Sequence, residues 1–293
     1  MEKKKVTKNI LGNVFHKLQI YLSKMPKDGR PRIDGVIFSN KGAMGREPIL
    51  DASLNETKDI MVYWHDSEKH IFEVTAVDPG YEIKTPKDMN SYFAYFNSRL
   101  MKLKYLDVTH LDVSQTQNFK CCFWGFGQGG ESQLVGVETW DVSNGQKFSN
   151  MFYACFYKNE RINLDLTSWN FLKDKCKDFS SMFEAFGYKA KEVRLNLSGW
   201  NVEMSESMSS MFREFAPEAT SVVLEGVENW QVPTLNCDYD YMFFSFSPMS
   251  GCCLNLEAWS QNFPLEIVEH HQFAENTFFR IKQPRWVLPN EYC

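Results

Sequence analysis

A repeat of about 30 residues organises most of this chain. One series of tryptophans recurs with gaps, found by subtracting residue numbers, of 29, 31, 30 and 29: Trp140, Trp169, Trp200, Trp230 and Trp259. A phenylalanine series has gaps of 30, 29, 31, 29, 31 and 30: Phe93, Phe123, Phe152, Phe183, Phe212, Phe243 and Phe273. Two series with one shared period indicate a solenoid or a related repeat architecture.

Each repeat unit has two halves with different periodicities. In the third unit, Leu164 to Phe171 alternates apolar and polar residues, which is typical of a strand with one buried face. Apolar residues at i, i+3, i+4 and i+7 between Phe179 and Phe186 predict a short helix. A single unit cannot bury both faces, so we expect the copies to stack on one another.

The sequence therefore predicts an α/β solenoid, a leucine-rich-repeat-like stack of strand-plus-short-helix units with a small N-terminal α+β module. We expect the module at residues 1–80, the repeats at 81–277 and an irregular closing segment at 278–293. The tryptophans from Trp140 onward and the phenylalanines from Phe123 onward are the expected structural core of the repeats.

Some positions depart from the repeat pattern or add to it. Glu225 stands where the other units have Val or Leu, and predicts a bulge. Gln261 replaces an apolar residue, which suggests that the sixth unit is an atypical terminal cap. A polar residue follows every tryptophan, and these residues are expected to satisfy backbone donors at a turn rather than to bind calcium.

The N-terminal module combines one helix with strands. Apolar spacing from Thr7 to Met25 predicts an amphipathic helix, which either docks on its own domain or serves oligomerisation or attachment to a larger assembly. Strands are predicted near residues 34–39, 59–65 and 71–77. The last two are expected to form a hairpin, and residues 40–57 a loop.

Charge is unevenly distributed along the chain. Residues 1–32 contain nine Lys or Arg and two acidic residues, a net charge of +7, so a total of -5 leaves -12 for the remainder. An acidic array argues against a nucleic-acid partner. We expect no signal peptide and no membrane insertion, because residues 10–25 are interrupted by polar residues; a cytoplasmic or virion-associated location follows.

The sequence offers little catalytic or metal-binding chemistry. The eight cysteines lack the C-x2-C spacing of a zinc site and are expected to be mostly reduced core residues. His65 and His70 flank the hairpin turn, and His270 with His271 lacks the ligands that would complete a metal site. The glycine-rich stretch at 125–130 lacks a phosphate-binding lysine and is expected to connect repeats. We expect no catalytic residue, metal or cofactor.

Two units carry a resemblance to a known family. Leu166-Thr167-Ser168-Trp169-Asn170 with Ser180-Ser181-Met182-Phe183 resembles the BspA-like leucine-rich repeats of bacterial surface proteins and mycoplasmas, and so does Leu197-Ser198-Gly199-Trp200-Asn201 with Ser209-Ser210-Met211-Phe212. The resemblance covers about residues 90–275. It implies a repeat fold, adhesion or protein binding, and no catalytic residues.

The first functional hypothesis is a non-enzymatic repeat scaffold that recognises a protein, such as a host surface protein, or a glycan. The second is a leaderless structural component of a larger assembly, such as a bacteriophage fibre or decoration protein. In that case the N-terminal region would anchor the chain, and residues 1–30 would mediate oligomerisation or assembly. The third hypothesis, an enzyme, has the least support. The partner-binding residues are not identified by the sequence.

Overall fold

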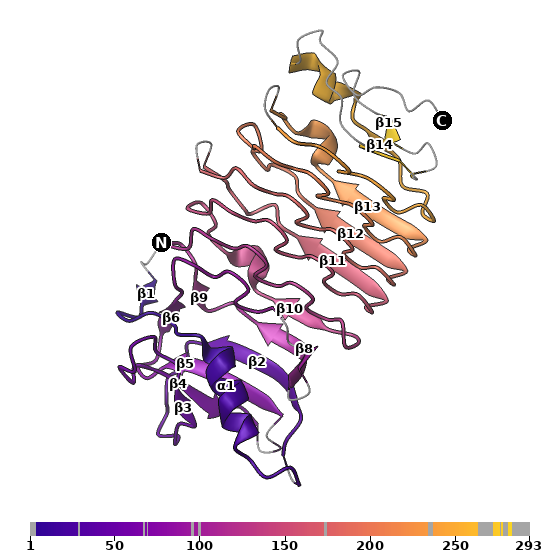
Figure 1. The fold of residues 1–293 in the computed structure, drawn as a ribbon. Helices are drawn as coiled ribbons and strands as arrows, with labels where there is room; N and C mark the ends of the chain where they lie inside the picture. Colours follow the sequence, from indigo (N-terminus) through magenta and orange to yellow (C-terminus); the bar gives the residue numbers. More distant parts are fainter. Residues whose placement is uncertain are drawn as a thin grey trace.

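The structure is a computed structural model that describes residues 4–28, 30–66, 68, 70–94, 97–98, 101–172, 175–233, 237–262, 272–275, 277 and 281–282. These residues form many short strands, one α-helix and three 3-10 turns. An N-terminal sheet with its helix lies at one end of the molecule, and the repeat units follow one another away from it (Figure 1). Most of the expected closing segment, including Cys293, lies outside the described residues, and so do His270 and His271 of the expected repeat region.

The largest sheet has the strand order β10-β8-β2-β5-β4-β3, with β7 paired to β8. Its strands are β2 (Ile33–Ser39), β3 (Leu50–Asp51), β4 (Ile60–Trp64), β5 (Ile71–Ala76), β7 (Asn97–Ser98), β8 (Met101–Asp107) and β10 (Gln133–Val135). Strands β4 and β5 pair antiparallel, which confirms the hairpin. Strand β3 lies inside the expected loop 40–57 and pairs with β4, so that segment is not wholly irregular.

Helix α1 (Val14–Ser23) is shorter than the predicted helix from Thr7 to Met25. Asn13 caps it, because its side chain accepts the His16 N–H at 3.1 Å. Residues before the cap extend instead, and β1 (Lys5–Val6) pairs with β6 (Tyr81–Lys84). The apolar stripe of α1 is buried, and Phe15 lies 5.5 Å from Phe93 between ring centroids. The helix thus docks on its own domain.

Backbone pairing continues across the expected boundary at residue 80. Strand β2 of the N-terminal part pairs in parallel with β8, and β8 pairs in parallel with β10 of the repeats. Strand β6 likewise lies between β1 and β9 (Leu111–Asp112). The N-terminal part and the first repeat units therefore share sheets.

Successive repeat units pair in parallel and in register. Strands β11 (Arg161–Asp165), β12 (Glu192–Asn196) and β13 (Ser221–Glu225) form one sheet and lie side by side (Figure 1). A second row of parallel bridges joins one residue per unit: Asp88, Asn118, Lys147, Asp178, Ser207 and Asp238. The last described strands, β14 (Leu254–Asn255) and β15 (Ile281–Lys282), also pair in parallel.

The short helix expected at the end of each unit is absent among the described residues, and that expectation is wrong. The segment from Phe179 to Phe186 is a run of turns with positive φ at Ser181 (52°) and Ala185 (54°). Some N–H groups bond within the run, as Met182 does to the Phe179 carbonyl at 3.1 Å. Others bond to the next unit, which a helix would not permit, and these bonds offset a backbone strain of order 1 kcal/mol per residue.

The phenylalanine series forms a buried column through the units. From Phe93 to Phe243 each ring stacks on the next, with centroids 5.1 to 5.7 Å apart and planes within 14° of parallel. Phe273 ends the column edge-on, at 69° to Phe243. The i, i+3, i+4 pattern therefore identified the buried residues correctly, although their backbone is not helical.

The bulge expected at Glu225 is also absent. Strands β12 and β13 pair without a register shift through Asn196 and Glu225. The extra residue of the fifth unit is accommodated after the strand, where Gly226 has φ 92° and starts the 3-10 turn η2 (Val227–Asn229). Gly136, with φ 91°, likewise precedes the 3-10 turn η1 (Val137–Thr139) in the second unit. A third 3-10 segment, η3 (Glu257–Asn262), follows β14.

Candidate functional site

The five tryptophans tie each unit to the one before it. All five are buried, with exposed fractions of 5% or less. Each indole N–H donates to a backbone carbonyl of the preceding unit, for example Trp169 to Val137 at 2.9 Å and Trp200 to Leu166 at 2.8 Å. Because the N–H groups are satisfied internally, these rings act as structural core and offer no donor to a ligand.

Polar residues after the tryptophan position cap backbone turns where the structure gives their contacts. The Asp141 carboxylate accepts the Ser143 N–H at 3.1 Å, and the Asn201 amide oxygen accepts the Glu203 N–H at 3.2 Å. Asp112, after the leucine that replaces tryptophan in the first unit, accepts the Ser114 N–H at 3.1 Å. These contacts confirm the turn-capping interpretation for these three residues.

The turns carry a continuous strip of half-buried side chains, each directly after a residue of the phenylalanine column. We call it the turn-face strip; it consists of Trp124, Tyr153, Glu184, Arg213 and Phe244, together with Tyr241. Backbone bonds hold its members in register, since Ala154 N–H donates to the Glu184 carbonyl and Ala185 N–H to the Arg213 carbonyl. The residue after each phenylalanine therefore occupies the same position in every unit, and Tyr241 adds a second ring in the fifth unit.

Aromatic rings lie at both ends of the turn-face strip and charges at its centre. Trp124 contacts Tyr153 edge-on at 5.9 Å. At the other end the guanidinium of Arg213 lies 5.7 Å from the Tyr241 ring and 5.6 Å from the Phe244 ring, within cation–π range. In parallel units the neighbour spacing is about 4.8 Å, so the strip is roughly 20 Å long.

The two central charges are close but weakly paired. Arg213 approaches Glu184 at 3.9 Å, beyond hydrogen-bond distance, and its Nε atom is buried with no hydrogen-bond partner among the described residues. Burial raises the pKa of the Glu184 carboxyl, and the nearby Glu214 adds to the effect, whereas Ser181 and Arg213 oppose it. Both groups thus retain capacity for a further polar partner.

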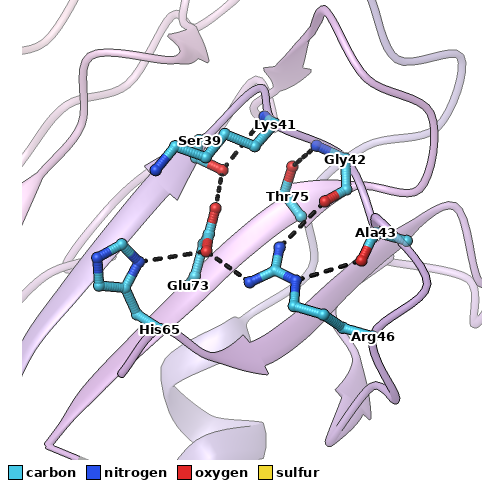
Figure 2. A network of polar contacts seen from close by, with 8 residues as sticks. All are labelled: Ser39, Lys41, Gly42, Ala43, Arg46, His65, Glu73 and Thr75. Atoms are coloured by element: carbon cyan, nitrogen blue, oxygen red, sulfur yellow. Dashed lines mark hydrogen bonds and ion pairs between the residues drawn. The ribbon is translucent and has the colours of Figure 1, made fainter. Parts of the chain in front are cut away.

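A second polar cluster lies in the N-terminal sheet around Glu73 of β5 (Figure 2). The Glu73 carboxylate accepts bonds from Arg46 at 2.7 Å and from the Ser39 hydroxyl, and lies 3.2 Å from His65 Nδ1. Burial alone would raise the pKa of Glu73, but the bonds from Arg46, Ser39 and His65 outweigh it, so the pKa is lowered. The carboxylate is therefore ionised at neutral pH.

The Glu73 cluster has the residue types of a catalytic triad in the wrong order. In a triad, histidine stands between the nucleophile and the carboxylate and removes the hydroxyl proton. Here the carboxylate stands between Ser39 and His65, so the imidazole is not placed to activate the hydroxyl. Arg46 also donates to the carbonyls of Gly42 and Ala43, which fastens the loop after β2 to the sheet (Figure 2). This arrangement supports a structural role.

Part of the repeat region is similar to a known family model. Residues 87–230 match the family model described as "Mycoplasma protein of unknown function, DUF285". No curated protein and no solved structure matches the chain. The DUF285 segment contains four of the expected core tryptophans, and the repeat continues beyond it through Phe243 and Trp259.

The turn-face strip begins in the DUF285 segment and extends past it. Trp124, Tyr153, Glu184 and Arg213 lie inside the matched residues, and Tyr241 and Phe244 lie outside. Known catalytic and metal motifs do not include such a strip, so it was not predicted from the sequence. The available signal was the position directly after each phenylalanine from Phe123 to Phe243, which holds aromatic residues at both ends of the series and charged residues at its centre.

Four of the seven described cysteines belong to the apolar core, whereas Cys121 and Cys252 are half-buried and Cys253 is exposed. Cys122, Cys155, Cys176 and Cys237 are buried, as expected from the sequence. Burial raises the pKa of each of these thiols. Neutral, buried thiols are poor nucleophiles and poor metal ligands, so these four residues serve packing.

The remaining candidates also have structural contacts. His70 bonds through Nδ1 to the Arg32 carbonyl at 2.9 Å, and His110 lies 3.1 Å from Glu82. The glycine-rich stretch 125–130 lies in turns, with positive φ at Gly125 and Gly127. Within the described part of the chain, no group of three or more His, Cys, Asp or Glu residues is placed to hold a metal ion. None of the helices described has the length and apolar character needed to span a membrane.

Proposed function

We propose that the chain is a non-enzymatic repeat scaffold that recognises a protein partner through the turn-face strip. In this proposal the units form a leucine-rich-repeat-like solenoid of the BspA-like type, with turns in place of the short helices. The parallel pairing of β11, β12 and β13 and the stacked phenylalanine column support such an arrangement. The DUF285 match is compatible with it and assigns no function.

The observation that carries the proposal is the composition of the strip. Trp, Tyr, Phe and Arg are the residues enriched at protein interfaces and at their energetic centres, and the surrounding surface of an ordinary protein is richer in Lys and Glu. Here all four types occur along five successive units, where Trp124 contacts Tyr153 and the Arg213 guanidinium lies over the Tyr241 and Phe244 rings. The rigid units hold the side chains in place, which reduces the entropy lost on binding.

The charged centre suggests what the partner presents. Among the described residues Arg213 has only long ion-pair contacts, at 3.9 Å to Glu184 and 4.0 Å to Glu214. Its guanidinium can therefore form a bidentate pair with a carboxylate of the partner. Aromatic side chains on both sides can receive apolar groups. We therefore propose a partner segment that carries a carboxylate flanked by apolar residues.

A peptide-display library panned against the purified full chain tests this proposal. We expect the selected peptides to contain Asp or Glu beside apolar residues. The variant Arg213→Ala should weaken their binding by about tenfold or more. Arg194→Ala is the control, because Arg194 lies on the exposed face of β12, outside the turn-face strip, and is already paired with Glu225 at 2.9 Å. Equal binding by Arg213→Ala and the wild type would refute the proposed site.

The second hypothesis, a structural component of an assembly such as a virion, has less support. Its expected anchor was the amphipathic helix in residues 1–30. The buried residues of α1, Val14, Phe15, Leu18 and Leu22, are covered by the chain's own sheet. Light scattering of the intact chain tests this alternative, since a stable higher-order assembly would favour it over the recognition scaffold.

A further inference from the structure

A pocket of about 300 Å³ lies between the fourth and fifth units, and none of its lining residues belongs to the turn-face strip. The fourth unit contributes residues 198–201, and the fifth contributes Gly226, Asn229, Trp230 and Gln231. This volume is at the lower end of the range of ligand pockets, roughly 300–1,000 Å³, and suits one ring-sized molecule.

The pocket lies where the two units differ in length, in the corner segment between the end of the strand and the tryptophan. The fourth unit passes directly from β12 into the Ser198-Gly199 turn, whereas the fifth inserts one residue and forms η2. Gly226 makes the close approach possible, because a Cβ there would lie 2.4 Å from the Ser198 backbone. A Cβ added to Gly199, which also lines the pocket, would meet no atom within 4 Å.

The polar side chains that line the pocket are uncharged. Asn201, Asn229 and Gln231 supply primary amides, and Ser198 supplies a hydroxyl. An amide offers both donors and an acceptor, which matches a ligand whose groups also donate and accept. The Asn201 oxygen already accepts the Glu203 N–H, so its NH2 group is the part directed to a ligand. With no ionised side chain in the lining, a phosphate or carboxylate would lose its hydration without a compensating charge.

Two indoles form a fixed apolar part of the pocket. Trp200 and Trp230 stack with planes 4° apart and centroids 6.1 Å apart. Their N–H groups donate to the Leu166 and Leu197 carbonyls, which fixes the ring orientation. An apolar ring edge beside several amides fits a molecule with both C–H surface and hydroxyl groups.

We propose that this pocket binds a neutral sugar residue, either a free monosaccharide or one unit of a neutral glycan. The inference stands on a different set of residues from the protein-binding strip, so either site can fail without the other. For a ligand of this size in a shallow site, we expect a dissociation constant on the order of 1 mM for the monosaccharide.

Saturation-transfer NMR on the full chain with glucose, galactose, N-acetylglucosamine and a neutral tetrasaccharide tests the proposal. At least one neutral sugar should show transfer, and glucuronate should show much less. Tighter binding of the tetrasaccharide would identify a glycan chain as the source, and equal binding would identify the free sugar. An absence of transfer from every neutral sugar, or equal transfer from glucuronate, would overturn the proposal.

Two variants locate the site. Asn201→Asp keeps the acceptor for the Glu203 N–H and removes the two amide donors, and Gln231→Ala removes an exposed amide. Each should weaken sugar binding tenfold or more. Asn170→Asp makes the same change at the equivalent exposed position of the third unit, outside the pocket, and should bind like the wild type. Unchanged affinity in Gln231→Ala, or an equal loss in Asn170→Asp, would refute the assignment.

Discussion

Phe93 and Phe123 stack face to face, with ring centroids 5.1 Å apart and planes 8° from parallel. Phe93 also contacts Phe15 of α1 at 5.5 Å and Phe38 of β2 at 5.9 Å. The column of the repeats therefore continues into the core under the N-terminal helix. The two parts share a hydrophobic core in addition to their shared sheets.

The first prediction concerns Phe93→Ala. Removing this fully buried ring should lower the free energy of unfolding by about 3–5 kcal/mol, because it leaves a cavity between both parts. Hydrogen exchange should show reduced protection on both sides, in β2 and at the Phe123 N–H that donates to Met151. Leu172→Ala, at a 43% exposed position, is the control and should change stability by less than about 0.5 kcal/mol. Lost protection on one side alone would show that the parts fold independently.

The second prediction concerns pH and Glu73. Glu73→Gln should lower stability at neutral pH by about 3 kcal/mol, because Arg46 loses the carboxylate of a largely buried pair. The folded-state pKa of Glu73 lies below its ordinary 4.5, so the advantage of the wild type is fully present above pH 4.5. It should decrease as the pH falls below that value and the carboxyl becomes protonated. Urea unfolding of both proteins across this range measures the difference, and a pH-independent difference would contradict the ion-pair explanation.

The third prediction concerns Glu184, whose pKa shift is opposite in direction to that of Glu73. Its folded-state pKa is raised by burial, so the ionised carboxylate destabilises the fold above its ordinary pKa of 4.5. Glu184→Gln should therefore be more stable than the wild type at neutral pH, and the two should converge as the pH falls below 4.5. Thermal unfolding at both pH values checks this. If Glu184→Gln is less stable at neutral pH, the contact with Arg213 contributes more than its 3.9 Å distance implies.

The fourth prediction compares two glycines with positive φ. A Cβ added to Gly80 (φ 81°) would have no atom within 4 Å, whereas a Cβ added to Gly226 (φ 92°) would lie 2.4 Å from Ser198. Gly80→Ala should cost about 1 kcal/mol, from backbone strain alone. Gly226→Ala adds a steric clash and should cost at least about 3 kcal/mol. Similar losses in the two variants, measured by urea unfolding, would show that the fourth and fifth units can move apart at this corner.

The sequence predicted the buried residues of the repeats better than it predicted their backbone. Phe179, Met182, Phe183 and Phe186 are all buried as the apolar spacing required. Helices and tight successive turns both repeat inward-facing positions at three and four residues, so spacing alone does not distinguish them. The deciding factor is the neighbouring unit, because N–H groups such as that of Phe183 bond to Met211 in the next unit.

Contacts between distant segments account for the other differences. The helix was predicted from Thr7, but the Thr7 N–H donates to the Glu82 carbonyl and the Leu11 N–H to the Lys84 carbonyl, which no local pattern reveals. The extra residue near Glu225 was visible in the sequence, but Gly226 was the residue that decided where the chain accommodated it. The turn-face strip depends on side chains about 30 residues apart, so it became recognisable only with the units in register.

The pairing of β2 with β8 has a consequence for how the protein is made. Strands β2 and β5, which pair with each other, both leave the ribosome before β8. The free edge of β2 can therefore be in place when β8, the first strand of the repeats, is synthesised and pairs with it. Every later unit then meets a finished neighbour on its N-terminal side. Synthesis and assembly can proceed in the same direction, and nascent units need not remain exposed to aggregation while the rest of the chain is translated.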